Sequence, residues 1–130
     1  MRERLRIDAV VTEQEGLGCR AEVILAAADR RESGTAEGAG TSSALVTLTA
    51  EATLLAILKI APDVPRAEID ATAITRVGGH EVAAAAILVM GPDGEEVLVG
   101  SALMGAAGPY DAVARAVLDA TNRRFSFFAR

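Results

Sequence analysis

The chain repeats itself, and this duplication constrains its fold more than any other feature. Ile7-Asp8-Ala9 recurs as Ile69-Asp70-Ala71, and Gly34-Thr35-Ala36 resembles Gly100-Ser101-Ala102. The offset is 62 residues at the first match and 66 at the second, so both matches keep the same order along the chain. A third match follows further along the chain, where Ala50-Glu51-Ala52-Thr53-Leu54 resembles Ala114-Arg115-Ala116-Val117-Leu118 at an offset of 64 residues. Similar segments in a constant order indicate two copies of one structural unit.

Each copy has the pattern strand, strand, strand, helix. Apolar residues alternate with others in the strand segments, as at Ala21, Val23 and Leu25, which predicts that they share one face of a strand. Pro62 ends the first helical segment, because proline cannot continue a helix. The first copy predicts strands at 4–13, 19–29 and 32–37 and a helix at 43–61, and the second predicts strands at 67–77, 80–90 and 95–104 and a helix at 109–124.

The fold expected from this pattern is α+β. Two strand-strand-strand-helix units, related by a pseudo-two-fold axis, would place one or two antiparallel sheets against two helices. A chain of 130 residues is short enough for one domain. We therefore expect a single domain over 1–130, with repeat units at 4–61 and 67–124 and a C-terminal tail at 125–130.

Composition limits the partners. The formal net charge is −5, which argues against nucleic acid and against anionic membrane surfaces. A single cysteine rules out an internal disulfide and favours a reducing cytoplasm. The first residues lack the apolar segment of a signal peptide, and no apolar stretch is expected to reach the roughly 18 residues of a membrane span. We expect a cytoplasmic protein with no nucleic-acid or membrane partner.

The later strands predict a partner of another kind. In the segment 80–90, alternate residues from Val82 to Leu88 are apolar, and so are those from Ala83 to Val89. A sheet with one face in water should alternate more cleanly, so a second subunit is expected to cover the other face. We therefore expect a homodimer. All three Phe residues fall in the tail 125–130, where they either fold back onto their own core or contact another subunit.

The chain has few residues for catalysis. His80 and Cys19 are the only histidine and cysteine, and both lie near expected turns. A Cys–His pair without an orienting group is poor chemistry, and two such residues cannot close a zinc site. Asp8 and Asp70 hold equivalent places, either as outward-facing residues or as two carboxylates that pair with arginine. We expect no enzyme activity, no catalytic residue, no metal and no cofactor.

Glycine-rich passages between the third strand and the helix are the strongest functional signal in each copy. Glycine lets a ligand approach the backbone closely, and the start of a helix offers free N–H groups that suit a carboxylate or phosphate. Asp111 would favour the ammonium group of an amino acid over a phosphate. The other interpretation is that these glycines only form caps and turns. The candidate ligand-binding residues are Gly38, Gly40, Thr41, Ser42, Ser43, Gly105, Gly108 and Asp111.

The second passage resembles a motif of a known family. Gly108-Pro109-Tyr110-Asp111-Ala112 is similar to the motif G-x-G-P-V-D-A in the C-terminal regulatory domain of 2-isopropylmalate synthase. Ala120-Thr121-Asn122-Arg123 is similar to the closing helix of that domain, whose topology the two units also share. The resemblance implies a dimer-forming, leucine-sensing regulatory module, which acts alone or beside a partner enzyme. It does not extend to acyl transfer, because the synthase's catalytic barrel has no counterpart in this sequence.

We therefore expect a non-catalytic, homodimeric, small-molecule-sensing module that binds an amino acid or a small carboxylate. A structural or protein-interaction module with no ligand is the main alternative. A small enzyme is another alternative, and so is a double-stranded RNA-binding-like domain, since 43–124 runs helix, three strands, helix. The RNA alternative is weak because the helix start at 108–111 has no lysine or arginine to hold phosphates.

Overall fold

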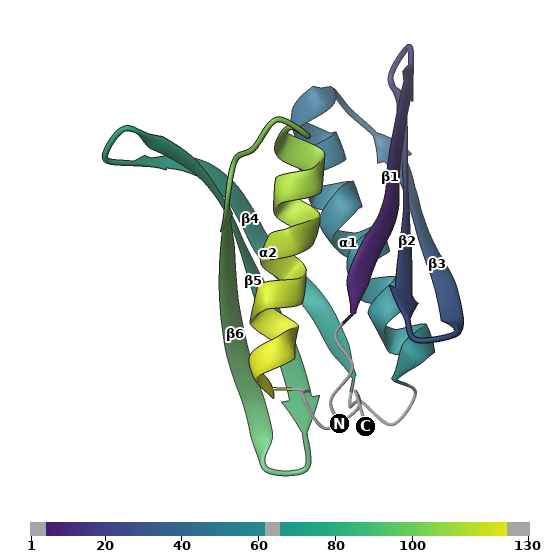
Figure 1. The fold of residues 1–130 in the computed structure, drawn as a ribbon, viewed down its shortest axis with the longest axis vertical. Coiled ribbons are helices and arrows are strands. Elements are labelled where there is room, and N and C mark those ends of the chain that lie inside the picture. Colours follow the sequence, from purple (N-terminus) through teal and green to yellow (C-terminus); the bar gives the residue numbers. More distant parts are fainter. Residues whose placement is uncertain (1–4, 62–65, 125–130) are drawn as a thin grey trace.

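The computed structural model describes residues 5–61 and 66–124, which form two strand-strand-strand-helix units in tandem (Figure 1). The elements are β1 (Arg6–Glu15), β2 (Gly18–Ala27), β3 (Arg30–Ala39), α1 (Ser42–Ile60), β4 (Ala67–Val77), β5 (His80–Gly91), β6 (Gly94–Leu103) and α2 (Pro109–Arg124). The strands form two antiparallel sheets, sheet A in the order β1-β2-β3 and sheet B in the order β4-β5-β6. The expected α+β fold, with a helix after each three-stranded unit, is confirmed.

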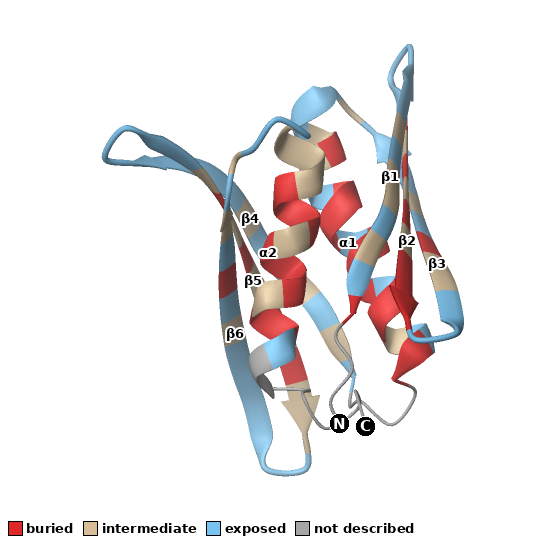
Figure 2. Cartoon of the chain, in the orientation of Figure 1, coloured by how far each residue is buried: buried red, intermediate tan, exposed pale blue. Residues whose placement is uncertain are grey.

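The two helices lie side by side between the two sheets (Figure 1). Helix α1 packs on β2 and β3, and α2 packs on β5 and β6. Each helix also contacts the first strand of the other unit, so the buried residues of both units join one hydrophobic core (Figure 2). Both helices begin at the same end of the molecule (Figure 1), and the two glycine-rich passages therefore lie at that end.

Some strand limits differ from the expected ones at turns that no glycine marks. The third strand, expected at 32–37, spans Arg30–Ala39, and the second ends at Ala27 instead of residue 29. The turn between them contains Ala28, whose φ is 53°. A left-handed backbone is uncommon for alanine, so the residue types do not indicate that the turn lies at this position.

The repeat extends to matching irregularities in the first strand of each sheet. The register shifts between Ile7 and Ala9 in β1, and between Ile69 and Ala71 in β4. Each Ile-Asp-Ala segment therefore carries a β-bulge at its aspartate. Asp8 is exposed, as the outward-facing alternative expects, and its carboxylate also lies 2.9 Å from Arg31 Nε, as the arginine-pairing alternative expects for this one site.

The second bulge has no such ion pair. The register places Val97 where the first sheet has Arg31, because Arg31 lies opposite Ala26 and Val97 lies opposite Leu88, the matching residue of β5. Asp70 is exposed, and no ion pair involves it among the described residues. The two aspartates therefore share a backbone position and differ in what surrounds them.

Glycine on the third strand lets each helix approach its own sheet closely. A Cβ on Gly34 would overlap the Ala52 carbonyl oxygen and lie 2.7 Å from the Ala56 nitrogen. A Cβ on Gly100 would overlap the Ala116 carbonyl oxygen and lie 2.8 Å from the Ala120 Cα. A strand glycine therefore faces two alanines one helical turn apart in both units. This repeated contact sets how closely each helix lies against its sheet.

Helix α1 is buried on several sides, which explains its composition. Glu51 and Lys59 are its only charged residues, and Thr49 and Thr53 are fully buried. The two threonine hydroxyls donate to the carbonyl oxygens four residues earlier, at 2.6 and 2.7 Å, so neither is left unpaired. The helix is long and apolar enough to cross a membrane, which corrects the expectation that no stretch reaches this length. More than half of it is buried inside this fold, as in a core helix.

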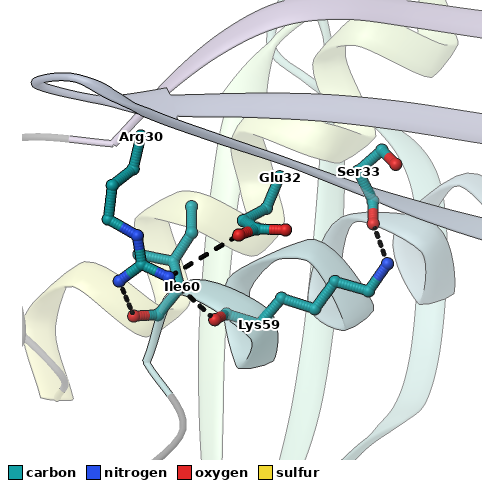
Figure 3. Close-up of polar contacts among 5 residues, drawn as sticks. All are labelled: Arg30, Glu32, Ser33, Lys59 and Ile60. Carbon is teal, nitrogen blue, oxygen red and sulfur yellow. Dashed lines mark hydrogen bonds and ion pairs between the residues drawn. The ribbon is translucent and has the colours of Figure 1, made fainter.

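Arg30, the first residue of β3, binds the end of α1 (Figure 3). Arg30 Nη1 donates to the Ile60 carbonyl at 3.1 Å, and Nη2 donates to the Lys59 carbonyl at 3.3 Å. The Lys59 ammonium in turn donates to the Ser33 carbonyl on β3 at 2.6 Å. The last carbonyls of a helix have no partner within the helix, and a basic side chain is favourable there. Arg30 therefore fixes the end of α1 to its own sheet.

We expect Gly34→Ala and Gly100→Ala each to lower the free energy of unfolding by about 1–3 kcal/mol, because an added methyl group must push the helix off the sheet. Gly79→Ala is the matched control, since a Cβ there meets nothing within 4 Å, and it should change stability by less than about 0.5 kcal/mol. Urea unfolding followed by circular dichroism measures all three. A wild-type midpoint for either of the first two variants would contradict the close approach.

Arg30→Ala should lower the free energy of unfolding by about 1 kcal/mol, because two carbonyls at the end of α1 lose a charged donor. Arg31→Ala, one residue further, removes only the exposed pair with Asp8 and should cost less. Thermal unfolding of the two variants provides the comparison. The role of Arg30 is refuted if its variant is no less stable than the Arg31 variant.

Candidate functional site

A cavity of about 450 Å³ opens where the two helices begin. It has walls from three elements that are distant in the sequence. The lining residues are Ser42, Ser43, Val46 and Thr47 of α1, Thr72, Ala73 and Ile74 of β4, and Pro109 and Tyr110 of α2. The starts of both helices therefore contribute to one cavity, which we call the helix-start cavity.

Neither helix start is closed by a side-chain cap of its own. Thr41 is the N-cap of α1 and makes no side-chain hydrogen bond to the helix; its hydroxyl lies 3.0 Å from that of Ser43. Gly108, directly before α2, has no side chain and takes a φ of +93°. Pro109 then begins the helix without an N–H group. The Ala44 N–H donates to the Thr41 carbonyl at 2.9 Å and the Ala112 N–H to the Gly108 carbonyl at 3.2 Å. The N–H groups of Ser42 and Ser43 in α1, and of Tyr110 and Asp111 in α2, have no acceptor within their helix.

The structure brings some of the predicted site residues together and leaves others apart. Ser42 and Ser43 line the helix-start cavity, facing Pro109 and Tyr110 of the second passage. Gly38 lines a separate open groove, with Glu13, Arg20 and Glu37 among others. The cavity lining does not include the remaining predicted residues, which are Gly40, Thr41, Gly105, Gly108 and Asp111.

Asp111 has another partner. Its carboxylate accepts a hydrogen bond from Arg115 Nε at 2.8 Å, one helical turn later. Arg115 also donates to the Leu103 carbonyl at the end of β6, at 2.9 Å. The Asp111 carboxylate therefore helps to fix α2 to its sheet, and the expectation that it would bind a ligand's ammonium group loses its support.

Sequence reasoning missed the contribution of β4 to this cavity. Thr72, Ala73 and Ile74 line it, and the Thr72 hydroxyl lies 3.0 Å from that of Thr47 on α1. These residues come from the first strand of the second unit, and nothing in their local pattern distinguishes them from other strand residues. Only the packing of β4 against α1 brings them to the helix starts.

Cys19 and His80 do not form a pair. The Cys19 thiol is buried and donates to the Gly40 carbonyl at 3.4 Å. His80 is exposed at the tip of the β4–β5 hairpin, and Figure 1 shows this tip and the β1–β2 tip on opposite sides of the molecule. Over the described ranges, 5–61 and 66–124, no three His, Cys, Asp or Glu side chains come together in a group that could hold a metal.

The outer faces of the two sheets, which point away from the helices, differ in character. On sheet A, Arg20 lies 3.3 Å from Glu37 and 3.9 Å from Glu13, and Asp8 pairs with Arg31. The two Arg20 pairs link neighbouring strands, and the Asp8–Arg31 pair joins β1 to β3 across β2, all on a surface in contact with water. The outer face of sheet A therefore has the polar character that an exposed sheet face normally shows.

The outer face of sheet B is apolar. Ala83, Ala85, Ile87 and Val89 of β5 are buried against the core, so the alternate residues of β5 and their neighbours on β6 point outward. Val97 and Val99 are 55% and 58% exposed. The expectation that β5 is apolar on both faces is confirmed, and no described element covers this side (Figure 2). The central residues of this face are Val82, Ala84, Ala86, Leu88, Val97 and Val99.

No protein-family model, curated protein or solved structure matches this chain. The resemblance to the regulatory domain of 2-isopropylmalate synthase therefore stays a prediction. Function has to be argued from the helix-start cavity and from the apolar face of sheet B.

Proposed function

We propose that this chain is a non-catalytic regulatory module that works as a homodimer and binds a small carboxylate in the helix-start cavity. The observation that carries the proposal is the shared cavity, to which the starts of both helices contribute. One uncapped helix start is a common feature of proteins. Two that open onto one cavity of about 450 Å³ offer N–H donors from two directions.

The lining indicates the class of ligand. Ser42 and Ser43 offer hydroxyl donors, while Val46, Ile74 and Tyr110 offer mainly apolar surface. Small-molecule sites commonly combine an apolar lining with a few placed polar groups. A carboxylate on a short branched apolar body matches this combination: the carboxylate would lie at the helix starts and the body against β4.

The lining also favours an acid over an amino acid. None of the residues that line the cavity carries a charge, and the nearby Asp111 carboxylate is already paired with Arg115. An ammonium group would lose water on entering the cavity and find no carboxylate there. We therefore propose a 2-oxo acid or similar monocarboxylate in preference to leucine, within the class of amino acids and small carboxylates that the sequence suggested.

Calorimetric titration with 4-methyl-2-oxopentanoate and with leucine tests the ligand class. The 2-oxo acid should bind with a dissociation constant below 1 mM, a binding free energy of about −4 kcal/mol or better, and leucine more weakly. Ser43→Asp should abolish binding, because it places a carboxylate in the first turn of α1, where the ligand's own would lie. The same change should leave the fold intact, since an acidic residue in the first turn of a helix is stabilising by about 0.3–1 kcal/mol.

Ser33→Asp is the matched control. It makes the same change of residue on the outer face of sheet A, and Ser33 does not line the cavity. Binding should survive there. The ligand proposal is refuted if the wild type binds neither compound. It is also refuted if the wild type and Ser43→Asp bind the 2-oxo acid with equal affinity.

A protein-interaction module without a ligand is the second candidate function. The apolar outer face of sheet B favours it, because a surface of this kind marks a contact with another protein and needs no small molecule. The two candidates differ in one result: the interaction module should associate and yet bind neither compound in the titration.

A further inference from the structure

We infer that two copies of this chain pair through the outer face of sheet B, one sheet lying on the other. This pairing rests on the homodimer of the proposed function and does not depend on the ligand. The face comprises the outward side chains of the three strands of sheet B, with Ala84 and Ala86 on the central strand β5 and Val97 and Val99 beside them on β6.

Comparison of equivalent positions singles out this face. Val97 and Val99 correspond in register to Arg31 and Ser33 of sheet A. The same backbone positions thus carry a charged and a hydroxyl side chain on one sheet and two exposed valines on the other. Since both units share one fold, backbone geometry does not require the valines. Apolar side chains in water are unfavourable, so a covering partner explains them best.

Part of the β6 edge of sheet B is already occupied by side chains of α2. The Asp119 carboxylate accepts from the Ser101 N–H at 3.0 Å, and Arg115 donates to the Leu103 carbonyl. Both groups belong to β6, whose edge would otherwise offer hydrogen bonds to a further strand. A strand added at this end of β6 would have to displace both α2 side chains. The face remains available.

The charges around the face favour a second copy in a particular orientation. Acidic residues lie on its margin, with Glu68 and Asp70 on β4 and Glu95 beside the β5–β6 turn, all in the half of the sheet toward Leu88 and Met90. A two-fold axis that reverses the strand direction separates the acidic halves of the two copies. Small central residues such as Ala84 and Ala86 let the sheets approach to about 10 Å, the usual spacing of stacked sheets.

The size of the face sets the expected strength. Three strands about 4.8 Å apart and about 30 Å long give a face of roughly 400 Å² on each copy, or about 800 Å² in all before rim contacts. Specific interfaces start near 1,200 Å², and obligate dimers bury about 2,000 Å² or more. We therefore expect a dimer that dissociates at micromolar concentration, in which loss of a central contact has a large effect.

Sedimentation velocity of the full chain from 1 to 200 μM tests the surface. Wild type should shift from monomer to dimer over this range. Val99→Lys should stay monomeric throughout, because it places a charge at the centre of the face. The free energy of unfolding of the Val99→Lys monomer should equal that of the wild-type monomer, since Val99 is exposed within one copy. Ser33→Lys, the equivalent change on sheet A, should dimerise as the wild type does.

Each sedimentation result either supports or overturns the pairing through sheet B. A wild type that is monomeric at 200 μM overturns the inference, and so does a Val99→Lys variant that dimerises like the wild type. Loss of dimer in the Val99→Lys variant but not in the Ser33→Lys variant supports it. Calorimetric titration of the Val99→Lys variant with 4-methyl-2-oxopentanoate distinguishes failure of the ligand proposal from failure of the dimer proposal. The titration measures ligand binding, and sedimentation measures association.

Discussion

The contact between a strand glycine and the helix that follows it organises this molecule. Gly34 faces Ala52 and Ala56, and Gly100 faces its alanines in the same way, so helix backbone rests almost directly on strand backbone. Such proximity leaves no space for side chains in between and fixes each helix against its sheet. The direction of each helix follows from its place after the third strand. Two copies of this unit, packed helix against helix, bring both helix starts to one end of the molecule (Figure 1).

The helix-start cavity is a product of the duplication. Neither unit alone has all three of its walls, because α1 and β4 come from different units and α2 completes the lining. The two outer sheet faces show the other result of duplication, divergence. Sheet A has ion pairs such as Asp8 with Arg31, whereas the equivalent position of sheet B carries Val97, and no ion pair involves Asp70 among the described residues. One outer face thus carries ion pairs between strands, and the other carries exposed valines.

The repeat and its element order could be predicted from sequence because they depend on local patterns. The helix expected at 109–124 has those limits in the structure, and the strand expected at 67–77 does too. The turn between the second and third strands was expected at 30–31 and lies at 28–29, because no glycine marks its position. The β4 wall of the cavity was not predicted, since Thr72 and Ile74 reach it only through packing between the units. Asp111 was expected to bind a ligand's ammonium group because it lies in the second glycine-rich passage. The four-residue spacing to Arg115 allows the ion pair that the structure shows but does not require it.

The ion pairs of sheet A have a consequence for the size of any assembly. A chain with two apolar faces on opposite sides could bind a neighbour at each and grow into a filament without limit. Here Arg20, Glu13 and Glu37 cover one side with charge, and burying them against a second sheet would cost their contact with water. In the dimer that we infer, the apolar face of sheet B is covered and sheet A offers only its charged face, so growth through these two faces ends at two copies.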